Sequence, residues 1–268
     1  MPIYTDQLKH EVRLTGIPKR IISLVPSQTE WLYELGLEEE VIGITKFCVH
    51  PENWFRAKTR VGGTKTVKVD VIASLQPDLI IANKEENVQE QIMQLEKIAP
   101  VWTSDISNIE EAYSMMQSIG QITGKSLQAE ILIGQIKNNF SELRIQQSQN
   151  KMYRTAYLIW KDPYMSVGGD TFINDMMQLS GFENVLSDHT RYPEITIAEL
   201  KAKKTELVLL SSEPYPFKQK HIDELQAQLP GTKIILVDGE IFSWYGSRMQ
   251  YATAYMHGLF QHIVSIKS

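Results

Sequence analysis

Short apolar runs alternate with helix-period segments along most of the chain, and this alternation restricts the fold more than any other feature. Runs such as "DLIIAN" (78–83) and "KIILVD" (233–238) are almost continuously apolar, as is typical of strands buried on both faces of a parallel sheet. Segments with helical periodicity separate such runs, for example residues 87–98 and 108–123. The pattern therefore predicts an α/β fold with central, mostly parallel sheets covered by helices.

The alternation stops after residue 123 and restarts after residue 150, with one helical segment between. Its apolar residues recur near the helical period and no proline interrupts them: Leu127, Ile131, Ile136, Phe140 and Leu143. About 22 residues of helix would extend roughly 33 Å, the width of a small domain. We expect two Rossmann-like lobes, residues 1–123 and 150–268, joined by a bridging helix over 124–149. An ordinary covering helix in one large sheet is the alternative.

Helix-end signals refine this assignment. Ser27 and Glu30 have the spacing of a capping box, and Gly36 stands where that helix should end. "GQITGKS" (120–126) resembles a phosphate-binding loop, but it has three residues between its glycines instead of four and follows a helical segment. It therefore marks the junction of two helices.

Charge, cysteine count and the N-terminus exclude several classes of protein. A net charge of −5 argues against a general nucleic-acid binder. The single cysteine excludes an internal disulfide and a cysteine-only zinc cluster. There is no export signal at the N-terminus and no run of about 18 apolar residues, which predicts a cytoplasmic protein without membrane insertion. A periplasmic or cell-surface chain whose signal had been removed, with Met1 supplied by a vector, would look the same.

The sequence contains no motif for catalysis, for a covalent cofactor or for a metal site. "KFCVHP" (46–51) is the most suggestive stretch, because it follows a strand and should lie at the carboxyl edge of a sheet, where α/β folds bind ligands. In an extended loop the side chains of Cys48 and His50, two positions apart, would point the same way and could line a binding site together. The alternative is that Cys48 packs as a small hydrophobe and His50 bonds a loop carbonyl.

A second unusual stretch is "DGEIFSWYGSRM" (238–249), which combines aromatic rings, carboxylates and an arginine directly after a strand. Aromatic faces bury large apolar areas, so such rings suit one wall of a binding site. Arg248 could pair with a ligand carboxylate or phosphate. Packing between loop and lobe is the alternative reading for the rings, Phe242 above all.

Taken in order, "RIISLVPSQTEWLYELGL", "RVGGTKTVKVDVIASLQPDLIIAN", the long helix, "TFINDMMQLSGFENV" and "YPEITIAEL" resemble substrate-binding proteins with a helical backbone. This class (class III) includes the vitamin B12-binding and iron-siderophore-binding components of ABC importers, and the resemblance covers residues 18 to 265. It implies no enzyme, but a protein that binds a metal chelate, either cobalamin-like or an iron complex such as a siderophore or heme, between two lobes. A small-molecule chelate would be the main partner, and an ABC permease is a candidate second partner.

The resemblance also assigns site residues. The ligand-binding set comprises loop residues of both lobes: Lys46, Cys48, His50, Lys84, Glu85, Trp160, Glu213, Tyr215, Phe242, Trp244, Tyr245 and Arg248. In this class one surface acid from each lobe docks on the permease. Asp70 matches the first, whereas the second falls at or beside Ala198, next to Glu199.

Two departures from the importer pattern leave other functions open. The chain shows no export signal, and its predicted site carries more acids than a simple B12 cleft needs. A cytoplasmic enzyme or carrier acting on a corrinoid or tetrapyrrole is therefore the alternative. In that case Glu213 or Glu86 would act as general base, with Cys48 or His50 assisting.

Overall fold

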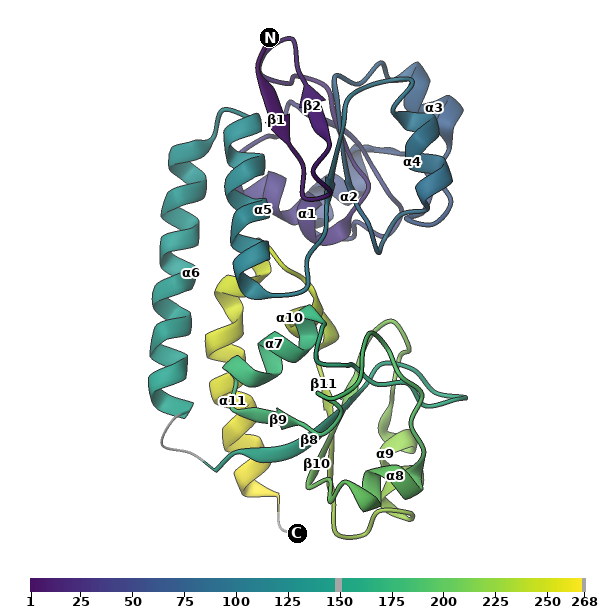
Figure 1. Ribbon diagram of the computed structural model, residues 1–268, viewed down its shortest axis with the longest axis vertical. Coiled ribbons are helices and arrows are strands. Elements are labelled where there is room, and N and C mark those ends of the chain that lie inside the picture. Colours follow the sequence, from purple (N-terminus) through teal and green to yellow (C-terminus); the bar gives the residue numbers. More distant parts are fainter. Residues whose placement is uncertain (148–150, 267–268) are drawn as a thin grey trace. The chain divides into compact units, whose positions relative to one another are not determined.

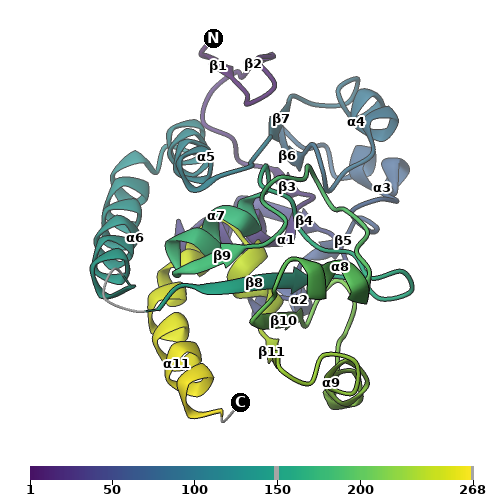
Figure 2. The same ribbon diagram turned by 60° about the horizontal axis from the view of Figure 1, so that its bottom comes forward.

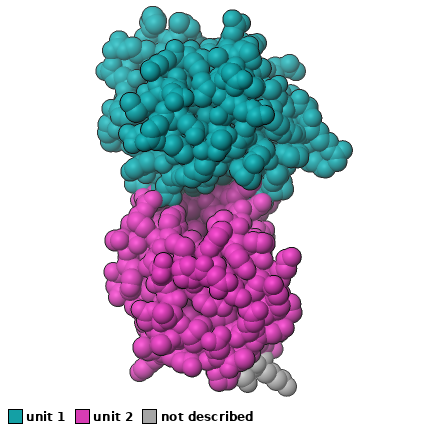
Figure 3. All heavy atoms as spheres, turned by 90° about the vertical axis from the view of Figure 1, so that its right-hand side faces the viewer, with its two compact units in different colours: residues 1–106, 110–134, 245–248 teal, residues 107–109, 135–244, 249–268 magenta. Residues whose placement is uncertain are grey.

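The computed structural model of the chain describes residues 1–147 and 151–266. Its contacts divide the chain into two compact units (Figure 3). Unit 1 comprises Met1–Ile106, Glu110–Gly134 and Tyr245–Arg248, and unit 2 comprises Ser107–Ile109, Gln135–Trp244 and Met249–Ser268. Each unit has a sheet of its own and is described by itself.

Unit 1 contains a five-stranded sheet in the order β5-β4-β3-β6-β7, and all neighbouring strands are parallel (Figure 2). Its strands are β3 (Ile21–Ser23), β4 (Val41–Ile44), β5 (Thr59–Arg60), β6 (Leu79–Asn83) and β7 (Val101–Ser104). The chain runs outward from β3 through β4 to β5, and then returns to the other side of β3 with β6. This reversal creates a topological switch point between β3 and β6, the place where doubly wound sheets bind ligands.

Helices follow each strand of unit 1 as the alternating pattern predicts. They are α1 (Pro26–Glu34), α2 (Glu52–Ala57), α3 (Val69–Ser74), α4 (Gln89–Leu95) and α5 (Ile109–Ile122). Figures 1 and 2 show α3 and α4 side by side, and Ile72 and Leu95 of these helices share a buried cluster with Ile22 and Ile80 of the sheet. This cluster forms the core on one face of the sheet.

Two features at the edges of unit 1 were not expected from the sequence. The N-terminal residues form an antiparallel hairpin of β1 (Ile3–Thr5) and β2 (Glu11–Arg13). Helix α1 begins at Pro26, and its N-cap residue Val25 supplies no side-chain cap, so the predicted capping box of Ser27 and Glu30 is wrong. Gly36 does follow the helix with a φ of 70°, as predicted for its end.

Unit 2 contains a four-stranded parallel sheet in the order β11-β10-β8-β9. Its strands are β8 (Tyr153–Leu158), β9 (Phe182–Asn184), β10 (Leu207–Ser211) and β11 (Lys233–Val237), and Figure 2 shows them in this order. Every residue from Leu207 to Leu210 is fully buried, as expected for a strand covered on both faces. The switch point of this sheet lies between β8 and β10.

The helices of unit 2 cover both faces of its sheet. They are α7 (Phe172–Leu179), α8 (Ile197–Ala202), α9 (Gln219–Gln226), α10 (Gly239–Ser243) and α11 (Ala252–Ser265), with the 3₁₀ helix η1 (Ser247–Tyr251) before α11. Leu200 of α8 and Leu225 of α9 pack with Leu158 and Leu210. Elsewhere, Phe182 of β9 stacks on Phe260 of α11, with 4.8 Å between ring centroids. Thr171 caps α7, accepting a hydrogen bond from the Asn174 amide at 3.2 Å.

Helix α6 (Ser126–Gln147) is one uninterrupted helix of 22 residues (Figure 1). The predicted end at residue 149 lies outside the described residues. The apolar face differs from the prediction, because Leu127 and Ile131 are exposed. The buried positions instead follow a spacing of three and four: Ala129, Ile133, Ile136, Phe140 and Leu143.

Candidate ligand-binding site

The predicted binding residues of unit 1 lie on loops at the carboxyl edge of its sheet. Lys46, Cys48 and His50 follow β4, whereas Lys84 and Glu85 follow β6. The two strands flank β3 on opposite sides. The topology therefore brings two segments almost forty residues apart to the same edge of one sheet.

The loop after β4 presents different side chains from those predicted. Cys48 is fully buried, and its Sγ lies 3.1 Å from Thr29 Oγ1 and 3.2 Å from Thr45 Oγ1. Burial raises the pKa of this thiol, which keeps it protonated at neutral pH. This environment matches the alternative in which Cys48 packs as a small hydrophobe. The thiol has no exposed surface with which to contact a ligand.

Phe47 is displayed where Cys48 was expected, with half of its surface exposed. The backbone explains the exchange: the Cys48 amide donates to the Thr45 carbonyl and the Val49 amide to the Phe47 carbonyl, so the loop is a tight turn. The alternation of an extended strand does not apply to a turn. The Phe47 ring packs over Gly63, where an added Cβ would lie 3.2 Å from Cε2, and Lys46 Nζ lies 5.0 Å from the ring centroid. We call Lys46, Phe47 and Gly63 the Phe47 platform; sequence reasoning selected Lys46 and missed the ring beside it.

The loop after β6 is held by buried amides. Asn83 Oδ1 accepts hydrogen bonds from the Glu85 and Glu86 amides, and Asn83 Nδ2 donates to Ser104 Oγ at 3.0 Å. The Asn87 side chain bonds the Asn83 amide and the Thr64 carbonyl, which ties this loop to the glycine loop at 62–67. These bonds fix the backbone of Glu85, so its position at the sheet edge is set by the fold.

The charged groups of this edge have partners of their own. Lys84 Nζ lies 2.6 Å from Asp105 Oδ2, and Lys65 donates to the Glu85 carbonyl oxygen. His50 is half-buried and precedes a cis proline, Pro51. Lys46 extends from the platform into solvent. The edge as a whole presents an aromatic face beside ammonium groups.

Tyr245–Arg248 also belongs to unit 1. Arg248 makes a two-pronged ion pair with Glu30 of α1, with Nη2–Oε1 at 2.7 Å and Nε–Oε2 at 3.0 Å, and both side chains are 13% exposed. The Arg248 guanidinium is thus engaged by Glu30 in this structure, and its pairing with a ligand anion stays a prediction. No spacing rule could find this pair, because the two residues are 218 positions apart.

The predicted aromatic wall in unit 2 is part of a helix and its packing. Phe242 of α10 is fully buried and lies 5.0 Å from the Tyr157 ring, so the packing alternative describes it. Trp244 is nearly buried and donates its Nε1–H to Glu213 Oε1 at 2.9 Å. Ser243 Oγ donates to the same oxygen at 2.7 Å. One carboxylate oxygen thus joins the loop after β10 to the end of α10.

Burial raises the pKa of Glu213, and the nearby Glu240 carboxylate raises it further, while the bonds from Ser243 and Trp244 oppose the shift. Gly239 makes this approach possible, since a Cβ there would lie 2.7 Å from Glu213 Cγ. Glu213 is therefore a buried structural acceptor at the carboxyl edge of the unit 2 sheet.

Trp160 and Tyr215 form the exposed aromatic group of unit 2. Trp160 is 41% exposed and meets the Tyr215 ring edge-on, with 5.6 Å between centroids. Tyr215 packs in turn against Phe217 and His221. Trp160 follows β8 and Tyr215 follows β10, so both stand at the switch point of this sheet. These two predicted residues are brought together by the fold.

The two predicted docking acids are both exposed. Asp70 lies in the first turn of α3. Glu199 completes a capping box in α8: its Oε2 accepts from the Thr196 amide and hydroxyl, both at 2.7 Å. These bonds from Thr196 lower the pKa of Glu199, so its negative charge persists at mildly acidic pH.

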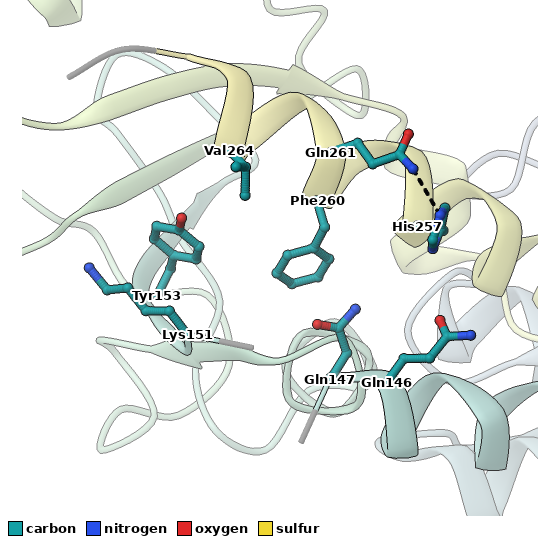
Figure 4. Close-up of a pocket in the computed structure, with 8 residues that line it drawn as sticks. All are labelled: Gln146, Gln147, Lys151, Tyr153, His257, Phe260, Gln261 and Val264. Atoms are coloured by element: carbon teal, nitrogen blue, oxygen red, sulfur yellow. Dashed lines mark hydrogen bonds between the residues drawn. The ribbon is translucent and has the colours of Figure 1, made fainter. Parts of the chain in front are cut away.

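Two pockets among the described residues lie elsewhere. One of about 480 Å³ in unit 2 opens between the end of α6, the start of β8 and α11, with Tyr153, Phe260 and Val264 among its lining residues (Figure 4). Another of about 460 Å³ in unit 1 lies beside Gly36 and Leu127. Neither contains a predicted binding residue. Within residues 1–147 and 151–266, no group of three or more His, Cys, Asp or Glu side chains is placed to hold a metal ion.

The sequence matches the family described as periplasmic binding protein over residues 21–233. The chain therefore belongs to the periplasmic binding protein family. It is 25% identical over 211 residues to the vitamin B12-binding protein of Yersinia pestis (strain Pestoides F), covering 78% of this chain and 73% of that protein. It is 28% identical over 199 residues to an uncharacterized ABC transporter substrate-binding lipoprotein of Bacillus subtilis (strain 168), covering 71% and 63%.

Among solved structures, a periplasmic heme binding protein from Pseudomonas aeruginosa superimposes with a TM-score of 0.78 at 20% identity, covering 93% of this chain and 94% of that one. The two-lobed α/β architecture predicted from the sequence is thus the fold of the family. The named relatives are binding proteins, which agrees with the expectation of a protein without catalysis and gives the enzyme alternative no support.

The comparisons do not support the cytoplasmic location expected from the N-terminus. One relative is a lipoprotein and the structural neighbour is periplasmic. Across the described part of the chain, no helix has both the length and the apolar character that crossing a membrane requires.

Proposed function

We propose that this chain is the substrate-binding component of an ABC importer, that it works outside the cytoplasm, and that its ligand is a metal chelate. Corrinoid, heme and iron-siderophore complexes are the candidate ligands. Membership of the periplasmic binding protein family and the names of the relatives support this class of ligand.

The observation that carries the proposal is the Phe47 platform. An exposed phenylalanine ring costs free energy in water, and full burial of such a side chain recovers about 1.5–3 kcal/mol. Lys46 beside the ring supplies a cation for an acidic substituent of the ligand, such as a propionate or phosphate. In unit 2, the exposed Trp160 ring offers a second apolar face. Flat chelates with acidic edges match both features.

The test is titration of the purified protein with cyanocobalamin, hemin and a ferric siderophore, followed by isothermal calorimetry and by the visible spectrum of each ligand. We expect micromolar or tighter binding of one class. Phe47→Ala should weaken that binding at least tenfold, because the ring provides the contact area.

Ile3→Ala is the matched control, since Ile3 is also an apolar side chain, 52% exposed, and stands on the N-terminal hairpin outside the predicted binding loops. Equal affinities of the two variants, or no binding of any of the three ligands, would contradict the proposal. For the permease, Asp70→Asn should reduce stimulation of transport by the loaded protein without changing its ligand affinity.

A further inference from the structure

Buried polar side chains gather at the switch point of the unit 1 sheet, where doubly wound sheets have their ligand crevice. Ser27 and Gln28 stand just after β3, and Ser104 ends β7. All three are buried, and Ser104 is bonded to Gln28 and to Asn83 at the end of β6. In doubly wound sheets such groups at the carboxyl ends of the strands meet a ligand.

In this chain the side chain of Tyr245 meets them instead. Its hydroxyl is hydrogen-bonded to Ser104, Ser27 and Gln28, and 9% of the residue is exposed. One phenol group therefore bonds residues from the ends of β3 and β7 together, as a bound ligand would.

The backbone next to Tyr245 packs closely against helix α1. Gly246 has a φ of 112°, and a Cβ there would lie 3.4 Å from the Ser27 carbonyl oxygen and 3.5 Å from Trp31 Cβ. Two residues further on, Arg248 pairs with Glu30. The segment thus lies along the first two turns of α1, although its sequence neighbours Trp244 and Met249 belong to unit 2.

We infer that Tyr245 acts as an internal ligand of unit 1: it fills the switch-point crevice and so restricts ligands to the outer rim of the sheet edge, where the Phe47 platform lies. Tyr245 would then determine specificity by exclusion. Small phenolic or catecholic molecules are refused because the tyrosine already occupies the place beside Ser27, Gln28 and Ser104, whereas a broad chelate rests on the rim. The specificity part of this inference rests on the proposed function; the filling of the crevice does not.

The experiment replaces Tyr245 with alanine and adds p-cresol, a small molecule with the structure of the deleted side chain. Tyr245→Ala should bind p-cresol, as cavities left by deleted rings bind molecules of matching shape. At five times the dissociation constant, p-cresol should raise the melting temperature of the variant by about 2–4 °C. Toluene, which lacks the hydroxyl, should bind at least about tenfold more weakly, because the polar groups remain unpaired. Wild type and Tyr245→Phe should bind neither probe.

Tyr255→Ala is the matched control, a half-buried tyrosine of α11 whose oxygen accepts from the Asp238 amide at 2.8 Å. Binding of p-cresol to wild type as tightly as to Tyr245→Ala would overturn the inference, and so would equal binding to Tyr245→Ala and Tyr255→Ala. If Tyr245→Ala does not fold, Tyr245→Phe decides: its melting temperature should fall by several degrees, and an unchanged value would show that the hydroxyl is not engaged. Failure of wild type to bind any chelate would remove the proposed function and leave the p-cresol result standing.

Discussion

The ion pair between Glu30 and Arg248 gives the sharpest quantitative prediction. Arg248→Met keeps much of the aliphatic length of the side chain and removes the guanidinium. Two charge-assisted hydrogen bonds are lost, and the Glu30 carboxylate remains at 13% exposure without its cation. Breaking a fully buried pair costs about 3–5 kcal/mol, and a pair with some access to water costs less, so we expect a loss of about 2–3 kcal/mol.

A neighbouring acid adds to this cost. Glu34 lies one helical turn beyond Glu30, and the Glu30 charge contributes, after burial, to the raised pKa of Glu34. Without Arg248 the two carboxylates repel each other at i,i+4, which costs a further few tenths of a kcal/mol. For a compact unit of this size the total corresponds to a fall in melting temperature of roughly 5–10 °C.

The assay is a double-mutant cycle with Glu30→Gln, Arg248→Met and the double variant, followed by calorimetry and by amide exchange of α1. We expect a coupling free energy of about 2 kcal/mol that largely persists in about 0.5 M salt, because buried pairs are screened little. A coupling below about 0.5 kcal/mol, or one that disappears in salt, would refute the reasoning and class the pair with exposed surface bridges.

Three further predictions follow from buried groups. Cys48 should react with a thiol-specific dye at least about 100-fold more slowly in the native than in the unfolded protein, since burial raises its pKa; rapid native labelling would place the thiol at the surface. The folded state raises the pKa of Glu213 above 4.5, so the native protein holds this proton to higher pH than the unfolded chain, and its contribution to stability falls as pH rises through that window. Glu213→Gln should therefore become more stable relative to wild type between about pH 4.5 and 8, whereas a constant difference in melting temperature would contradict the shift. Gly62→Ala should destabilise by about 2–3 kcal/mol, because φ is 107° and a Cβ would lie 2.5 Å from the Thr66 carbonyl oxygen; Gly16→Ala, with open space around it, should stay within about 0.5 kcal/mol in the same denaturation experiment.

The sequence was sufficient to predict the main strands of both sheets. The apolar runs at residues 78–83 and 233–238 correspond to β6 and β11, and β6 is buried throughout because strands covered on both faces must be apolar along their length. The N-terminal hairpin and β9 have three residues in each strand, too few for any periodicity to be recognised. Helix α10 has only five residues, which are also too few for a helical period to be recognised in the sequence.

The candidate site was predictable only as far as its loops. The order of the strands places residues 46–50 and 84–85 at one sheet edge, as the family resemblance implied. Which side chain a loop displays depends on its turns, and a turn of 45–49 exposes Phe47 and buries Cys48. The partners of Arg248 and Trp244 depend on contacts between distant segments, which local sequence patterns do not contain.

Trp244 and Tyr245 are buried and hydrogen-bonded, so replacing both by alanine should lower the melting temperature.

The membership of Tyr245–Arg248 in unit 1 has a consequence for biosynthesis. Almost all of unit 1 is complete when Gly134 has been made, yet the tyrosine that fills its crevice is translated more than a hundred residues later. The sheet of unit 1 is therefore synthesised long before this tyrosine, and the contacts of Tyr245 with Ser27 and Ser104 are among the last of the unit to form.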